Sequence, residues 1–172
     1  MNVLNAGQIT LEPQTVEHAE EMFAVLSDAA IYKYENEPPA SVEWLRNRYR
    51  QLETRRSPDG NQQWLNWVVR LSDSKLAGYV QATVGADGNC DIAYVFASAY
   101  WGKGYATKSV ESMIAALIDE YSVHTLWAVF KSDNDRSRRL LERLEFGPAT
   151  PVASRNHEVE PGEMLMTRNA AI

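Results

Sequence analysis

Two glycines separated by one residue, Gly102 and Gly104, stand where an alternating strand pattern gives way to a helical pattern. Glycine lets the backbone come close to a ligand, and the free N–H groups and dipole of a helix N-terminus favour an anion. A pyrophosphate fits such a site, and Lys103 adds a positive charge beside it. An ordinary turn uses the same residue types, so the spacing by itself indicates an anion site without identifying the anion.

Two nucleotide-binding motifs are excluded by spacing. A Rossmann fingerprint needs a third small residue at the G-x-G-x-x-G position, where this chain has Thr107. A Walker A loop needs G-x-x-x-x-G-K, whereas Lys103 lies between the glycines. The segment therefore predicts neither a dinucleotide fold nor a P-loop.

A second polar group stands at the start of the next predicted helix. Ser137 precedes Leu140, Leu141 and Leu144 by three, four and seven residues, so its hydroxyl begins a stripe that should be buried. From the residues alone, a serine that bonds the backbone of the first helical turn accounts for this position.

The elements that position these groups begin with a strand and two helices. Residues 8–12 alternate as a short strand, and Thr15 can cap a helix whose apolar residues run at helical spacing to Leu26. Ser41 can cap a second helix, which ends near the turn at residues 58–60.

Three alternating runs follow at 64–71, 76–84 and 92–96, with short turns between them. Such turns predict an antiparallel meander, because parallel neighbours need a crossover. The pattern then becomes helical, with one apolar face from Ala106 to Tyr121.

The remaining chain predicts a strand, a helix and a hairpin. Residues 124–130 form a nearly continuous apolar run, as expected for a strand covered on both faces. After the helix that begins near Ser137, residues 146–153 and 158–167 read as a closing hairpin with its loop at 155–157.

Composition limits the protein's class and partners. With 172 residues, 45% of them hydrophobic, the chain is expected to form a single globular domain over 1–172. The 23 acidic and 17 basic residues give a net charge of -6, which argues against nucleic acid and suits a cationic amine. The single cysteine, Cys90, excludes an internal disulfide and a cysteine-rich metal site, and no metal is expected. No apolar run approaches the ~20 residues of a membrane span, so we expect a cytoplasmic protein, monomeric or homodimeric.

The stretch from Ala93 to Thr107, AYVFASAYWGKGYAT, resembles motif A of the GNAT acetyltransferase superfamily, in the form typical of ribosomal-protein N-terminal acetyltransferases. The segment from Asn134 to Phe146, NDRSRRLLERLEF, is similar to that family's downstream element. The resemblance extends over nearly the whole chain.

The resemblance implies a mixed α/β GNAT fold. Its sheet would have seven mostly antiparallel strands, about four flanking helices, and a splayed parallel pair at 91–97 and 124–130 that admits the pantetheine arm of acetyl-CoA. The residues implied to contact acetyl-CoA are Phe96, Ala97, Ser98, Trp101, Gly102, Lys103, Gly104, Tyr105, Ala106, Thr107, Asn134 and Ser137.

The implied activity is acetyl transfer from acetyl-CoA to a primary amine by direct attack in a ternary complex. Ser137 would protonate the leaving thiolate, and Asn134 would fix the turn or contact the cofactor. Asp91 stands where similar proteins carry a glutamate and is the candidate base, although a solvated strand-end aspartate is the commoner case. A shortened acid at this position also fits a non-catalytic acyl-CoA-binding module.

The acceptor would be a protein N-terminus or a small-molecule amine, and the implied acceptor wall contains Tyr32, Tyr34, Glu35 and Trp64. Aromatic and acidic groups attract a cationic amine by roughly 0.5–2 kcal/mol per contact. Trp67, on the apolar face of its strand, is expected in the core.

Two departures from the family pattern bear on the site. Trp101 replaces the usual Gln or Arg, which removes one phosphate contact. Glu145 replaces the glycine that usually ends the last helix, so a left-handed cap there would cost ~1 kcal/mol unless the helix stops differently.

Overall fold

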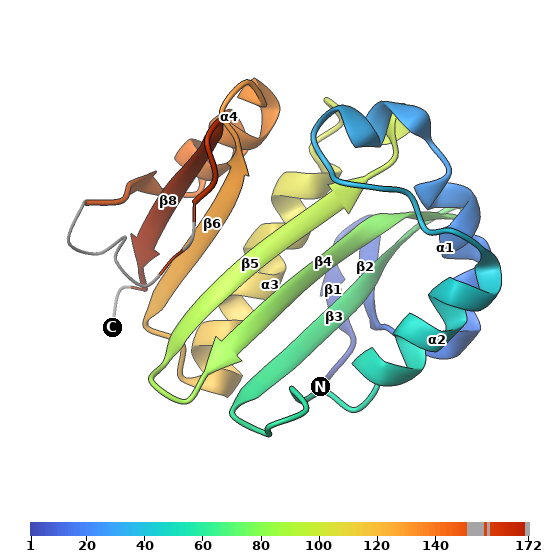
Figure 1. The fold of residues 1–172 in the computed structure, drawn as a ribbon, viewed down its shortest axis with the longest axis horizontal. Coiled ribbons are helices and arrows are strands. Elements are labelled where there is room, and N and C mark those ends of the chain that lie inside the picture. The colour runs from blue at the N-terminus through green and yellow to red at the C-terminus, as the bar shows by residue number, and fades with distance from the viewer. Residues whose placement is uncertain (151–156, 158, 171–172) are drawn as a thin grey trace.

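The computed structural model describes residues 1–150, 157 and 159–170, which form one eight-stranded sheet and four α-helices (Figure 1). The strands are β1 (Leu4–Ala6), β2 (Ile9–Pro13), β3 (Gln62–Leu71), β4 (Leu76–Gly85), β5 (Asn89–Phe96), β6 (Thr125–Lys131), β7 (Gly147–Pro148) and β8 (Glu163–Asn169). The helices are α1 (Ala19–Leu26), α2 (Val42–Leu52), α3 (Tyr105–Tyr121) and α4 (Asp135–Arg143), with the 3-10 turns η1 (Val16–His18), η2 (Ala29–Lys33) and η3 (Ser98–Tyr100). None of the described helices is long and apolar enough to cross a bilayer.

The strand order is β1-β2-β3-β4-β5-β6-β8-β7, and the described sheet has eight strands rather than the seven expected. The additional strand is β1, which pairs antiparallel with β2 around Gly7. Three residues are too few to show a period of two, so the alternation that revealed β2 is absent here. Gly7 has φ +71, which is the conformation that a tight turn requires.

The predicted meander of β3, β4 and β5 is antiparallel throughout, as expected. Of the predicted closing hairpin, the described residues contain β7, which covers Gly147–Pro148, and β8, which begins at Glu163. Residues 151–156 and 158, which include most of the predicted loop, lie outside the described residues.

The sheet is covered on both faces, and successive residues of β3 face opposite layers. Trp67 and Val69 belong to the larger core cluster, which includes the inner face of α3, whereas Val68 belongs to a second cluster with α1 and α2. Burial on both faces explains why five consecutive residues of β3, 65–69, are buried. Trp67 is 1% exposed, which confirms its predicted place in the core.

The predicted parallel pair is β5 and β6, and the two strands separate part of the way along (Figure 1). Their pairing joins Asn89–Asp91 to Thr125–Trp127 and then stops, although β5 continues to Phe96 and β6 to Lys131. The diverging halves leave main-chain groups of both strands facing a wedge-shaped gap.

Helices α2 and α4 each begin with a side-chain cap. Ser41 accepts a hydrogen bond from the Trp44 N–H at the start of α2, at 3.0 Å. The Asn134 side chain accepts one from the Ser137 N–H at the start of α4, at 3.2 Å. These bonds satisfy N–H groups that have no partner within the helix.

Helix α4 ends in a left-handed residue, and that residue is Glu145, with φ +65. The Phe146 N–H donates to Leu141 O at 3.0 Å, and the Glu145 N–H donates to Glu142 O at 3.0 Å. This is the bonding pattern of a Schellman cap. The helix therefore keeps the geometry that glycine usually provides, at the energetic cost expected for glutamate.

Candidate active site

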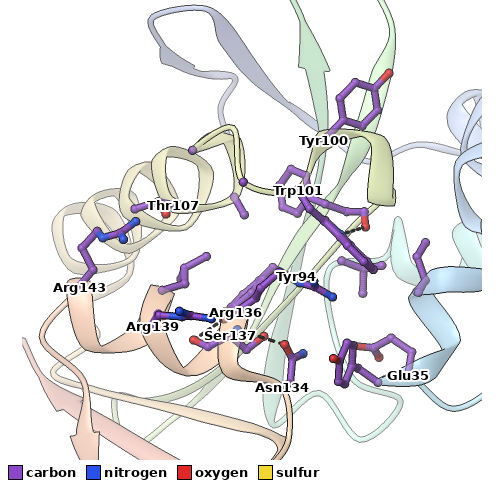
Figure 2. A pocket seen from close by; sticks show the side chains of 18 residues that line it. Glu35, Tyr94, Tyr100, Trp101, Thr107, Asn134, Arg136, Ser137, Arg139 and Arg143 are labelled. Atoms are coloured by element: carbon purple, nitrogen blue, oxygen red, sulfur yellow. Dashed lines mark hydrogen bonds between the residues drawn. The ribbon is translucent and has the colours of Figure 1, made fainter.

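A cavity of about 380 Å³, here called the wedge cavity, occupies the gap between β5 and α4 (Figure 2). It is lined by Ile31, Tyr34, Glu35, Tyr94, Val95, Phe96, Tyr100, Trp101, Gly102, Gly104, Ala106, Thr107, Asn134, Arg136, Ser137, Arg139, Leu140 and Arg143. The two sequence motifs, which are about 30 residues apart in the chain, thus form opposite walls of one cavity.

The glycine loop leads directly into α3. Gly102 and Gly104 have φ +72 and +81, and no atom lies within 4 Å of a Cβ built at either position. The indole N–H of Trp101 donates to Phe96 O at 2.8 Å, which ties the loop to the end of β5. The loop therefore presents bare backbone and the N-terminus of a 17-residue helix to the cavity, as an anion site requires.

The edge of β5 contributes main-chain groups through Phe96. The Ala97 N–H donates to Ala77 O at 3.0 Å, and Phe96 stands opposite Gly78 in the ladder. This register makes Phe96 and Gly78 a non-hydrogen-bonded pair, so the Phe96 N–H and C=O point away from β4 and toward the wedge.

The other two amides predicted to contact the cofactor are already engaged. The Ala97 N–H bonds β4, and the Ser98 N–H donates to the Asp28 carboxylate at 2.6 Å. The hydrogen bonds from Ser98 and from the Ala30 N–H lower the pKa of Asp28. Asp28 thereby fixes the segment around η2 to the loop that follows β5, so Phe96 is the one of these three residues whose N–H faces the gap.

Three arginines of α4 line the cavity: Arg136, Arg139 and Arg143. The Arg136 guanidinium lies over the Trp101 ring, with its carbon 3.8 Å from the centroid, and 5.5 Å from the centroid of Tyr34. Arg143 lies beside the first turn of α3 near Thr107 (Figure 2). Although the protein is acidic overall, three positively charged side chains thus line the cavity in which the sequence predicted an anionic ligand.

The first turn of α4 places Ser137 and Asn134 on the cavity wall (Figure 2). Asn134 fixes this turn through its bond to the Ser137 N–H, which confirms one of its two predicted roles. The Tyr94 hydroxyl lies 3.5 Å from Ser137 O, and burial raises the pKa of Tyr94 to about 12. A hydroxyl from β5 and a hydroxyl-bearing residue of α4 thus lie side by side.

A second cavity of about 420 Å³, here called the helix-side cavity, lies among α1, α2 and the sheet. It shares Ile31, Glu35 and Val95 with the wedge cavity. Among the predicted acceptor residues, Tyr32 lines the helix-side cavity, Tyr34 lines the wedge cavity, and Glu35 lines both.

The side chains of several predicted residues do not line either cavity. Trp64 is not a lining residue and packs under the Arg48 guanidinium, 5.9 Å from the ring centroid. Ala97, Ser98, Lys103 and Tyr105 are also absent from the lining, and Lys103 lies 5.7 Å from the Tyr100 ring centroid.

Asp91 also lies apart from both cavities, on the paired part of β5. Its carboxylate is 2.9 Å from His157 Nε2, and its side chain is 56% exposed. The His157 ring lies against Trp127, with centroids 4.5 Å apart. An exposed carboxylate beside a loop histidine is consistent with the alternative of a solvated strand-end aspartate.

Burial raises the pKa of the Cys90 thiol to about 12, and Cys90 packs in the core. A thiol in this state is not a nucleophile near neutral pH. Among the described residues, no group of three or more His, Cys, Asp or Glu is placed to hold a metal ion.

The sequence reasoning missed the three arginines and Tyr94. The arginines follow Asn134 at positions 136, 139 and 143, a spacing that puts them on one helical stripe, and this signal was available. Tyr94 alternates with Ile92 and Phe96 like a core residue, and the sequence does not reveal that β5 loses its neighbour at this point.

Comparisons with known proteins agree with this geometry. A family described as an acetyltransferase (GNAT) domain matches residues 8–147. The uncharacterized N-acetyltransferase p20 of Bacillus licheniformis is 24% identical over 148 residues, which cover 85% of this chain and 83% of that protein.

Two solved structures share the fold at low identity. RimL, a ribosomal L7/L12 alpha-N-protein acetyltransferase in complex with coenzyme A, superposes with a TM-score of 0.82 at 13% identity, covering 98% of each chain. The ribosomal-protein-S5-alanine acetyltransferase from Vibrio fischeri superposes with a TM-score of 0.81 at 16% identity, covering 98% of this chain and 97% of that one.

Proposed function

Because the chain belongs to the GNAT acetyltransferase family, whose pattern matches residues 8–147, we propose that it transfers an acetyl group from acetyl-CoA to a primary amine. The observation that carries the proposal is the wedge cavity, which joins a glycine loop and helix N-terminus to the first turn of α4. A single domain would supply all of these groups.

The described residues fit acetyl-CoA along the length of the wedge. The inward-facing main chain of Phe96 would pair with a pantetheine amide, in place of the strand pairing that β5 loses. The N–H groups from Gly102 to Ala106 would hold the pyrophosphate, and Arg139 and Arg143 would neutralise phosphate charge. Arg136 brings a cation beside Trp101, which stands where the family pattern commonly has Gln or Arg.

The proposed reaction is direct attack in a ternary complex. The neutral amine nitrogen forms a bond to the acetyl carbon, and the C–S bond breaks with its electron pair on sulfur. Ser137 lines the wedge beside Tyr94 and would give its hydroxyl proton to the leaving thiolate. This role uses the side chain, because the bond that caps α4 uses the Ser137 backbone.

The acceptor would reach the acetyl group from the helix-side cavity, which meets the wedge at Ile31, Glu35 and Val95. The Glu35 carboxyl at this junction and the aromatic rings of Tyr34 in the wedge cavity and Tyr32 in the helix-side cavity favour a cation. We propose a protein N-terminal amine or a small amine as acceptor. The named activity of RimL supports the first, and the net charge of -6 is compatible with both.

The test is an acceptor screen on the purified protein. Isothermal titration should give a binding signal for acetyl-CoA, and free thiol should appear with at least one member of a panel of polyamines, aminoglycosides and peptides that begin with Ser or Ala. Mass spectrometry should detect the acetyl group on that amine. No binding at high micromolar acetyl-CoA contradicts the proposal, and binding without transfer would identify a non-catalytic acyl-CoA-binding module.

A further inference from the structure

We propose that Glu35 is the group that takes the proton from the acceptor amine, a role that the sequence assigned to Asp91. This inference rests on the proposed acetyl transfer. It concerns the residue that makes the amine reactive.

The position of Glu35 carries the inference. The residue follows η2 and lines both the wedge cavity and the helix-side cavity. Among the described residues that line the wedge, Glu35 is the one carboxylic acid. Figure 2 shows it on the wall opposite the first turn of α4, across the cavity from Ser137. A nitrogen that enters from one cavity to meet an acyl group in the other must pass this carboxyl.

The carboxyl is also free to accept a proton. In the described part of the chain, the Glu35 side chain makes no hydrogen bond or ion pair, whereas the Asp91 carboxylate bonds His157 at 2.9 Å. Asp91 also lies on the paired part of β5, outside both cavities. The geometry thus favours Glu35 over Asp91 for contact with an amine.

The charges around Glu35 suit a base at neutral pH. Partial burial raises the pKa of Glu35, and Lys131 on β6 opposes this by its positive charge. Tyr32 after α1, Tyr79 on β4 and Tyr94 on β5 face it as neutral groups, since burial raises the pKa of each. A carboxylate whose pKa is raised is a stronger base than a glutamate with the ordinary pKa.

Arg48 on α2 and Arg136 on α4 are the other cations that line the two cavities near this point, and Glu37 adds a second carboxylate on the helix-side cavity. These neighbouring charges are the same in the wild type and in a neutral variant of Glu35, so a comparison of the two at one pH isolates the contribution of the Glu35 carboxyl.

The proposed step balances. Glu35 takes one proton from the ammonium form of the acceptor, and the nitrogen lone pair then forms the C–N bond as the C–S bond breaks. Ser137 protonates the thiolate, and the second nitrogen proton restores the Ser137 hydroxyl through solvent. Glu35 releases its proton to water, so the products are an amide, a thiol and one proton.

The experiment compares Glu35→Gln with the wild type. Glutamine keeps the shape and cannot accept the proton, so kcat at saturating acceptor should fall by ~10²-fold or more at pH 7, in the range of general-base effects. An amine that is already neutral at pH 7, such as an arylamine of low pKa, should lose much less. Affinity for acetyl-CoA, measured by titration, should stay within about twofold of wild type. The matched control is Glu111→Gln on the exposed face of α3, which removes the same charge and should leave kcat unchanged.

A Glu35→Gln enzyme with kcat within about threefold of wild type overturns the inference. So does a variant in which KM alone rises, because that result assigns Glu35 to amine binding. The outcome is separate from failure of the proposed function, in which wild type itself transfers no acetyl group. A folding defect would appear as lost acetyl-CoA binding in the variant, and Glu35→Asp then decides: it should recover part of kcat if a carboxylate is what the site needs.

Discussion

Ser137 lies in the first turn of α4, where the bond that caps the helix uses its backbone N–H and leaves its hydroxyl out of the cap. A hydroxyl in this position can be removed without removing the cap. The chemistry of the side chain and the stability of the helix are therefore separable at this residue.

We predict that Ser137→Ala lowers turnover more than it lowers cofactor affinity. The loss of a proton donor should reduce kcat by ~10²-fold, whereas the Kd for acetyl-CoA should change by less than about threefold. Steady-state kinetics and titration calorimetry measure the two quantities. An unchanged kcat would remove Ser137 from the reaction and direct attention to the neighbouring Tyr94 hydroxyl.

Arg143 is expected to contribute to acetyl-CoA binding through its charge and not through close packing. We predict that Arg143→Gln weakens acetyl-CoA binding by about 3- to 10-fold at low ionic strength, since one exposed charge contact to phosphate is lost. The difference from wild type should shrink as salt is raised. Arg46→Gln on α2, remote from the wedge lining, is the matched control and should bind as wild type does. A deficit that is independent of salt would contradict the charge argument.

At the scale of elements, α4 carries a structural cost beside the site. Glu145 holds a left-handed conformation that glycine adopts without strain, and the bonds around it complete the helix cap. Its contact with Arg168 is 3.7 Å long, and its side chain is 82% exposed, so the ion pair offsets little of that cost.

We predict that Glu145→Gly stabilises the protein by ~1 kcal/mol, because the strain is relieved and the cap is kept. Urea unfolding gives the free energy. The control is Glu142→Gly, three residues earlier on the exposed side of the same helix, which should destabilise by ~0.5–1 kcal/mol because its backbone is right-handed. Equal effects of the two substitutions would contradict the assignment.

At the scale of the whole molecule, the cofactor would add contacts between the two sides of the wedge. We predict that coenzyme A at about 100 times its Kd stabilises the fold by ~2.7 kcal/mol, which corresponds to a rise in Tm of about 5–10 °C for a chain of this size. Thermal unfolding with and without ligand measures the shift. The Gly104→Ala variant, with a Cβ on the bare loop, should show a smaller shift, and an equal one would count against the loop as the phosphate site.

The sequence predicted those parts of the fold and site that lie in continuous segments. The glycine loop, the Asn134 cap and the buried face of Trp67 each follow from neighbours within a few residues. The left-handed cap at Glu145 is one of the two helix endings that the sequence left open.

The parts that could not be predicted depend on how distant elements meet. Whether Arg139 faces the wedge depends on how α4 docks beside α3, and this is a property of the assembled core. Judged from the sequence, both Asp91 and Glu35 could be the base. In the structure, β5 still pairs with β6 at Asp91, so Asp91 does not face the gap. A local pattern carries no information on where two strands part.

The separation of β5 from β6 creates two strand edges inside the sheet instead of at its rim. An unpaired edge is a template for recruitment of another chain, and exposed edges promote aggregation. Here α3, α4 and the η2 segment surround the opening, so a slender ligand can enter and a foreign β-sheet cannot. The unpaired main-chain N–H and C=O groups of β5 and β6 therefore remain available to a bound ligand but not to a strand of another protein molecule. The same gap that would bind the substrate also protects two strand edges from aggregation.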